Sequence, residues 1–116
     1  GRWLIEDARA AIRPQANRMA REIGHKLRRI RIGDPATRWG SCSSTGTLSF
    51  SWRLVMAPAE VLEYVVAHEV AHLAELNHGK RFWSTVDLLV DDTAAPRQWL
   101  RTNGAKLRRY GEPRAR

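Results

Sequence analysis

The sequence predicts an α+β fold in which a small antiparallel sheet of two or three strands packs on one buried helix, with additional helices around it. Apolar residues recur at helical spacing in four stretches of the chain. Between the first and second stretch, short runs that alternate apolar and polar residues are separated by turn-forming residues. A chain of 116 residues is long enough for one hydrophobic core, so we expect a single domain over residues 1–116.

The first predicted helix covers residues 3–23, where arginines are interspersed with a stripe of apolar side chains. The stripe consists of Leu4, Ile5, Ala8, Ile12, Ala16, Met19 and Ile23. Pro14 interrupts the pattern, so we expect either a kink or two consecutive helices with Pro14 in a first turn. Gly24 is the expected end of this segment, because glycine commonly follows the last helical residue.

Short strands are expected between this helix and residue 52. Residues 29–32 alternate arginine with isoleucine, which indicates a half-buried strand, and the turn sequence Gly33-Asp34-Pro35 follows it. Residues 37–42 and 47–52 are the second and third strand, with a turn at residues 43–46 between them. Together these strands would form the antiparallel sheet.

The central helix is expected to begin at Ala57-Pro58, because proline is well tolerated in the first turn of a helix. Apolar residues occupy most of its circumference, which is typical of a buried helix. They are Val61, Leu62, Val65, Val66, Val70, Leu73 and Leu76. We expect this helix to stop at Asn77-His78-Gly79, and two further helices to cover residues 80–90 and 96–107.

The net charge of +8 is concentrated at the two ends of the chain. Residues 1–31 carry nine basic and three acidic groups, residues 32–100 carry five and eight, and residues 101–116 carry six and one. A basic surface attracts polyanions, so nucleic acid is a candidate partner through the basic termini. We therefore divide the predicted domain into a basic N-terminal helical segment 1–26, a core 27–107 and an Arg-rich tail 108–116.

Composition also bears on cellular location. The chain has no apolar run of the ~18 residues that a membrane span needs, so no membrane is expected as a partner. Its one cysteine, Cys42, rules out an internal disulfide and is typical of a reducing compartment. We expect a cytoplasmic protein.

The segment His68-Glu69-Val70-Ala71-His72 contains the candidate metal-binding and catalytic residues. Residues four apart lie on the same face of a helix, so His68 and His72 can bind one metal ion. Glu69 is placed to act on a water molecule at that ion, as in the H-E-x-x-H arrangement of zinc peptidases. Buried imidazoles and a buried carboxylate without such partners would cost several kcal/mol, which favours a metal site over a structural role.

A third ligand is needed, and His78 is the first candidate. On an unbroken helix, His78 would lie ~15 Å beyond His68, too far to reach the same ion. The chain must therefore turn back, and the neighbouring Asn77 and Gly79 favour such a turn. Glu75 is the main alternative, either as a ligand or as a hydrogen-bond partner of a ligand imidazole, and Asp87 is a weaker one.

These residues predict peptide or amide hydrolysis with one Zn²⁺ per chain. Zinc held by three neutral imidazoles keeps its full charge, so it acidifies a water molecule and polarises a substrate carbonyl. Glu69 would be the general base that takes the proton of that water and passes it to the leaving amine. Tyr64, Arg38 and Arg53 are candidates for stabilising the oxyanion.

The chain resembles the YgjP-like family of predicted zinc metallopeptidases. The matching segments are Arg38–Ser43, Leu48–Leu54, Tyr64–Leu73, Asn77-His78 and Arg81–Trp83. The resemblance implies a compact zincin-like core, with His68, His72 and His78 as zinc ligands, Glu69 as catalytic acid and base, and a protein or peptide substrate. It also implies kinship with the SprT-like and WLM proteases, some of which act on proteins attached to DNA.

In peptidases of this architecture, a sheet strand beside the metal commonly pairs with an extended substrate, and residues 47–51 or 38–42 are the candidate edge. The histidine spacing is also similar to that of the metzincins, but Glu75 replaces their glycine and no methionine follows to form their Met-turn.

Two other functions remain open from the sequence. The ribosome-maturation endoribonuclease family has three histidines at this spacing, although it lacks a glutamate after the first. A non-catalytic module, in which zinc only joins the helices while the termini bind nucleic acid, is the other.

Overall fold

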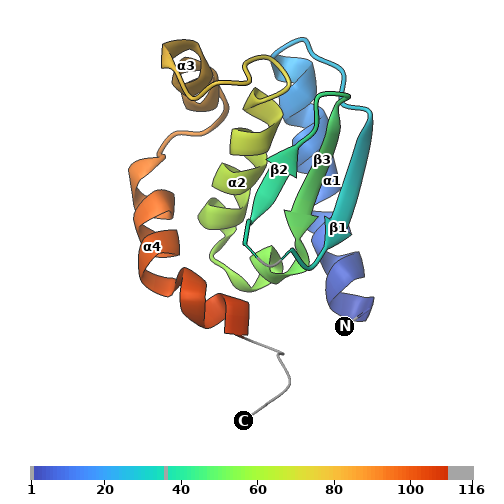
Figure 1. The fold of residues 1–116 in the computed structure, drawn as a ribbon, viewed down its shortest axis with the longest axis vertical. Helices are drawn as coiled ribbons and strands as arrows, with labels where there is room; N and C mark the ends of the chain where they lie inside the picture. The colour runs from blue at the N-terminus through green and yellow to red at the C-terminus, as the bar shows by residue number, and fades with distance from the viewer. Residues whose placement is uncertain (1, 36, 110–116) are drawn as a thin grey trace.

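The computed structural model describes residues 2–35 and 37–109 (Figure 1). Four α-helices, one 3₁₀ helix and a three-stranded sheet form the structure. In chain order the elements are α1 (Arg2–Glu22), β1 (Arg29–Gly33), β2 (Gly40–Cys42), β3 (Thr47–Ser51), the 3₁₀ helix η1 (Trp52–Met56), α2 (Ala59–Ala71), α3 (Lys80–Leu89) and α4 (Ala94–Arg109). The α+β class predicted from the sequence is confirmed.

The sheet is mixed, with strand order β1-β3-β2. Strands β2 and β3 form an antiparallel hairpin, whereas β1 and β3 are parallel. The expectation of a wholly antiparallel sheet is therefore wrong for the β1–β3 pair. The physical reason is the connection after β1. It passes the position that β3 later takes, so β2 forms the opposite edge of the sheet and β3 then returns between β1 and β2. As a result, β2 is an edge strand and β3 is central.

One face of the sheet packs on helices. Ile30 lies opposite Leu48 and Ile32 lies opposite Phe50, and these four side chains share that face. Leu48 and Phe50 are fully buried. Helices α1 and α2 lie behind the sheet in Figure 1, α4 runs alongside α2, and α3 sits at the end of α2. The core therefore lies between the sheet and the pair α1 and α2, with α2 at the centre.

Helix α1 continues through Pro14 as one helix, so the alternative of two consecutive helices is wrong. Pro14 is on the exposed side, where its ring meets solvent rather than the core. Gly24 ends the segment as expected, with a positive φ of 71°. The His25 amide donates to the Ala20 carbonyl at 3.0 Å and the Gly24 amide to the Arg21 carbonyl at 3.1 Å, which is the Schellman arrangement.

Helix α2 begins one residue after Pro58 and ends at Ala71, six residues before the predicted stop at Asn77. Tight turns follow, in which the amides of Leu73 and Ala74 bond to carbonyls three residues back. Leu76, which extends the apolar pattern in the sequence, is 70% exposed. Leu76 therefore has no core to pack against, whereas Leu73 is partly buried against the core.

Three further boundaries differ from the predictions. Residues 52–56 form the 3₁₀ helix η1, which the sequence analysis placed partly in the third strand; the Ser51 hydroxyl caps it by accepting from the Arg53 amide at 3.1 Å. Helix α4 starts at Ala94 and extends to Arg109, so the first two residues of the predicted Arg-rich tail are helical. The rest of that tail, residues 110–116, lies outside the described residues. None of the helices in the described part of the chain has the length and hydrophobicity required to cross a membrane.

Candidate metal centre

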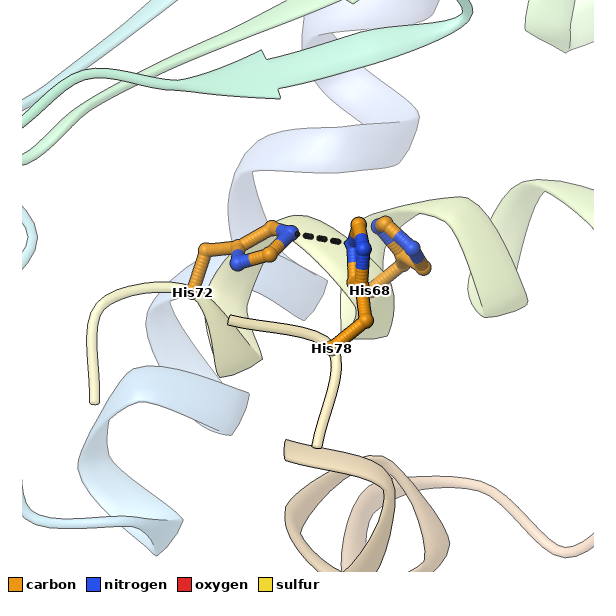
Figure 2. Close-up of side chains that lie close together, drawn as sticks. All are labelled: His68, His72 and His78. Carbon is orange, nitrogen blue, oxygen red and sulfur yellow. Dashed lines mark hydrogen bonds between the residues drawn. The ribbon is translucent and has the colours of Figure 1, made fainter. Parts of the chain in front are cut away.

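The three histidines of the predicted site converge (Figure 2). His68 lies in the last turn of α2, and His72 is the residue that caps the helix. His72 keeps helical torsion angles (φ −67°, ψ −16°), so it remains one turn above His68 on the same face. The loop between α2 and α3 brings His78 back to this face, with its Nε2 atom 3.0 Å from Nε2 of His72. One ring nitrogen from each histidine lies within 4.8 Å of the others.

These separations fit a single metal ion. Three nitrogens that each lie ~2.0 Å from one ion at tetrahedral angles are ~3.3 Å apart. The His72–His78 separation of 3.0 Å is close to this value, and all three nitrogens lie within 4.8 Å of one another. His68, His72 and His78 can therefore hold a metal ion together.

Hydrogen bonds to the Nδ1 atoms of His68 and His72 leave the lone pair of each ring on Nε2. Nδ1 of His72 donates to the Glu75 carbonyl oxygen at 3.0 Å. Nδ1 of His68 lies 3.1 Å from Oε2 of Glu69, a carboxylate oxygen that accepts its hydrogen. Such bonds fix the tautomer and the orientation of a metal-binding imidazole. Both rings are thus held with the Nε2 lone pair available to a metal.

The two alternatives for the third ligand lie outside this cluster. Within the described residues, the group able to hold a metal consists of the three histidines, without Glu75 or Asp87. Glu75 contributes its backbone carbonyl to His72 rather than its carboxylate to a metal. The early end of α2 makes the approach of His78 possible, because six residues of turn and loop replace the helix that would have carried it away.

Aromatic side chains from the first turn of α3 pack against the histidines. The Phe82 ring is fully buried, and its centroid lies 4.9 Å from His68, 4.5 Å from His72 and 4.8 Å from His78. Trp83 lies against His68 and His78. The pKa of His78 is lowered, first by desolvation and then by the neighbouring imidazoles of His68 and His72. This environment favours the neutral imidazole, the form that binds metals.

The Glu69 carboxylate is buried beside the histidines, with the residue 6% exposed. Gly40 of β2 lies directly over it: a Cβ atom at Gly40 would sit 2.8 Å from Cγ and 3.2 Å from Oε2 of Glu69. Besides burial, the charge of the Glu69 carboxylate raises the pKa of two neighbouring side chains, Cys42 and Tyr64. Burial is the larger cause of the raised pKa of the Cys42 thiol, and Glu69 adds to it. The pKa of Tyr64 is also raised, mainly by burial.

A cavity of about 240 Å³ opens beside His68 and Glu69. We call it the aromatic cavity; it is lined by Trp39, Gly40, Tyr64, Val65, His68, Glu69 and Leu100. These residues come from β2 and the loop before it, from α2 and from α4. A buried carboxylate, two aromatic rings and the histidine cluster therefore meet at one opening, at the edge of the sheet.

The profile of the YgjP-like metallopeptidase domain matches residues 1–103. The chain belongs to the YgjP-like metallopeptidase family. The fold is similar to that in the crystal structure of the metallopeptidase zymogen of Pyrococcus abyssi abylysin, with a TM-score of 0.67, 20% identity, and coverage of 83% of this chain and 94% of that chain. A search of curated proteins finds no match.

Family membership implies a metal ion for this fold. A metallopeptidase requires a metal ion, and the three histidines of this chain are able to hold one. The resemblance stated from the sequence is confirmed. The same family implies that the substrate is a protein or peptide.

Several residues at the site escaped the sequence analysis. Gly40 approaches Glu69 closely, and a glycine inside a predicted strand was the available signal for such an approach. Leu100 reaches the site from α4, and no local pattern indicates that contact. Of the three oxyanion candidates, Tyr64 lies at the cavity. Arg53 is buried, forms an ion pair with Asp34 and lies over the Trp52 ring, and Arg38 is exposed outside the cavity lining.

Proposed function

We propose that this protein is a zinc-dependent peptidase in which Glu69 is the general base. The observation that carries the proposal is the position of the Glu69 carboxylate. It is buried, it touches a histidine of the metal-binding cluster, and it lines the cavity through which a substrate would approach. A buried carboxylate at such an opening is suited to moving a proton during hydrolysis.

The donor set favours zinc, one ion per chain. Three imidazole nitrogens with an open fourth position are typical of catalytic zinc sites, and hard ions such as Mg²⁺ or Ca²⁺ prefer oxygen ligands. The described residues of the cluster provide nitrogen ligands alone. His68, His72 and His78 are the proposed ligands.

Zinc would supply a water that is acidic near pH ~7 and a polarised substrate carbonyl. The protein residues supply the proton transfers. Glu69 would accept the proton of the attacking water while its own charge is held in place by the His68 imidazole at 3.1 Å. As the carbon–nitrogen bond breaks, Glu69 would return this proton to the leaving amine, so that the carboxylate is regenerated at the end of the cycle.

Strand β2 is the proposed docking edge for the substrate backbone. Residues 47–51 are excluded from this role because β3 lies between β1 and β2. Trp39 and Ser43, which flank β2, bond to β3. By the alternation of antiparallel pairing, Ser41 faces β3 as well. The backbone groups of Gly40 and Cys42 therefore point away from β3, toward the open edge. They are placed to pair with an extended peptide above α2.

The test is the Glu69→Gln variant, which keeps the shape of the side chain and removes its basicity. We expect zinc content to stay near one per chain and hydrolysis of an unfolded protein substrate to fall by at least ~100-fold. Glu60→Gln, on the exposed start of the same helix, is the matched control and should leave hydrolysis unchanged. Undiminished hydrolysis by Glu69→Gln would contradict the proposed role.

The same assay separates the other functions considered from the sequence. RNA cleavage that survives Glu69→Gln would favour the endoribonuclease. Zinc binding without hydrolysis of either polymer would favour the non-catalytic module. The cytoplasmic location stays a prediction from the cysteine content.

A further inference from the structure

A second cavity lies on the other side of the histidine cluster from the aromatic cavity. It measures about 400 Å³, and we call it the hydroxyl cavity. It is lined by Lys26, the turn residues Ser43, Ser44, Thr45 and Gly46, and His72, Leu73, Ala74 and Leu76. The aromatic cavity is lined by α2 residues between Tyr64 and Glu69, and the hydroxyl cavity by residues between His72 and Leu76, which follow the end of α2. The two cavities therefore flank the cluster along the direction of α2.

Away from His68 and Glu69, the aromatic cavity is lined by aromatic and aliphatic side chains. The Trp39 ring packs on α4, where a Cβ atom added at Gly104 would be 3.5 Å from it, and the Arg108 guanidinium lies 4.2 Å above its centre. Leu100 of the same helix and Tyr64 of α2 form the remaining apolar lining with Val65. An apolar cavity of ~150 Å³ accommodates benzene. The aromatic cavity, at about 240 Å³, is large enough for one aromatic or large aliphatic side chain.

The hydroxyl cavity has a different chemistry. Among the described residues that line it, Lys26 is the cationic one and none is acidic. The Ser43 hydroxyl is engaged in the turn, where it accepts from the amides of Thr45 and Thr47 at 3.3 and 3.0 Å. Lys26 and the exposed Ser44 remain as hydrogen-bond donors at the rim. A cation with hydroxyl donors favours a carboxylate.

We propose that the two cavities are side-chain subsites of unlike chemistry. The peptidase would prefer substrates with a large apolar side chain on one side of the cleaved bond and an acidic side chain on the other. This inference rests on the proposed function, because the histidine cluster between the cavities is taken as the place of cleavage. The edge of β2 connects them: Gly40 lines the first cavity and Ser43 the second, three residues along the chain. An extended peptide spans that ~10 Å with four residues.

Peptides that vary at one position test the aromatic cavity. Leu100→Trp should fill it and lower kcat/KM about tenfold or more for a peptide with Phe at the apolar position, while a peptide with Ala there loses little. Leu100→Ala should widen it and shift the preference toward Trp. Leu88→Trp, at a side chain that is 79% exposed, is the control and should leave kcat/KM unchanged for both peptides. Equal losses for the Phe and Ala peptides would overturn the assignment of this subsite.

Charge reversal tests the hydroxyl cavity. Lys26→Glu should lower kcat/KM about tenfold for a peptide with Asp or Glu across the cleaved bond and raise it for the matching Lys peptide. Arg13→Glu makes the same charge change at an exposed position of α1 and should leave the ratio of the two peptides unchanged. An unaltered ratio in Lys26→Glu would overturn the acidic subsite.

Binding to the Glu69→Gln variant separates this inference from the proposed function. One outcome is that the wild type cleaves no peptide while the Glu69→Gln variant binds the peptide with one apolar and one acidic side chain at least tenfold more tightly than the same peptide with Lys in place of the acidic residue. In that case the subsites stand and the peptidase proposal fails. If peptides are cleaved without regard to either side chain, the peptidase stands and the subsites are overturned. Fluorescence anisotropy of labelled peptides gives the affinities in both cases.

Discussion

At the scale of single residues, the site depends on a glycine that leaves room for a carboxylate. Glu69 is buried under β2, and the space it occupies is the space that a side chain at position 40 would take. The carboxylate can therefore meet His68 and the aromatic cavity at once. This contact depends on an approach between residues far apart in the sequence, so local patterns did not reveal it.

Gly40→Ala is expected to displace Glu69 and lower hydrolysis about 10- to 100-fold while zinc content is retained. The cause is the 2.8 Å contact that the new methyl group would make with Cγ of Glu69. Gly33→Ala is the matched control, because a Cβ atom there would meet nothing within 4 Å. Loss of zinc from Gly40→Ala, or full activity, would contradict this account.

The Cys42 thiol reports the charge of Glu69. Burial and the Glu69 carboxylate both raise the pKa of this thiol, because each disfavours the thiolate. In metal-free protein, Glu69→Gln removes the second cause, so the pKa of Cys42 should fall. Alkylation by iodoacetamide should then reach its half-maximal rate at a lower pH than in the wild type. An identical pH profile would mean that the two side chains do not interact.

At the scale of elements, the loop between α2 and α3 completes the histidine cluster. The start of the cluster was predictable, because the four-residue spacing of His68 and His72 is local. The end of α2 was not predictable, since Leu73 and Leu76 continue the helical pattern in the sequence, although the structure leaves Leu76 70% exposed. The turn itself was foreseen, but six residues too late.

Zinc should stabilise this loop and the fold with it. At a free zinc concentration ~100 times Kd, binding contributes about 2.7 kcal/mol, which corresponds to a rise in Tm of roughly 10 °C for a domain of this size. His72→Ala should abolish that rise, because it removes the central imidazole of the cluster. Differential scanning fluorimetry with and without a chelator measures the zinc-dependent rise in Tm for the wild type and for His72→Ala. A zinc-dependent Tm in His72→Ala would contradict the proposed ligands.

Helix α1 contains an unfavourable residue, Pro14, in its interior. Proline removes one backbone hydrogen bond and crowds the preceding turn, at a cost of up to ~3 kcal/mol. Pro14 is exposed, so Ala can replace it without changing the core. Pro14→Ala should therefore raise the free energy of unfolding by about 1–2 kcal/mol, as measured by urea denaturation. An unchanged or lowered stability would show that Pro14 contributes contacts beyond its own helix.

At the scale of the whole molecule, the presence of the four α-helices in the described residues was predicted because their periodicity is long and continuous, although the end of α2 was placed six residues too late. The parallel direction of β1 relative to β3 was not predicted, because the alternation of side chains along a strand does not show in which direction the neighbouring strand runs. The aromatic cavity also eluded prediction, since α4 contributes Leu100, which lies 28 residues beyond His72. The family resemblance supplied the function because its motifs combine local patterns from several elements.

The basic ends of the chain predict salt-dependent binding to nucleic acid. Arg29 and Arg31 are exposed on one face of β1, within the segment that carries nine basic groups. If they contact phosphates, the double substitution to Gln should reduce the slope of log K against log salt concentration by about two units. The measurement is anisotropy of a labelled oligonucleotide across a salt series, and absence of binding at low salt would contradict the prediction.

The central claim is that one zinc ion, held by His68, His72 and His78, makes this protein a peptidase. The most direct measurement is a titration of chelator-treated protein with zinc while peptide hydrolysis is followed. We predict that activity is absent at the start, rises in proportion to added zinc and reaches a plateau at one equivalent per chain. Hydrolysis by the metal-free protein, or a plateau at a ratio clearly different from one zinc per chain, would contradict the account.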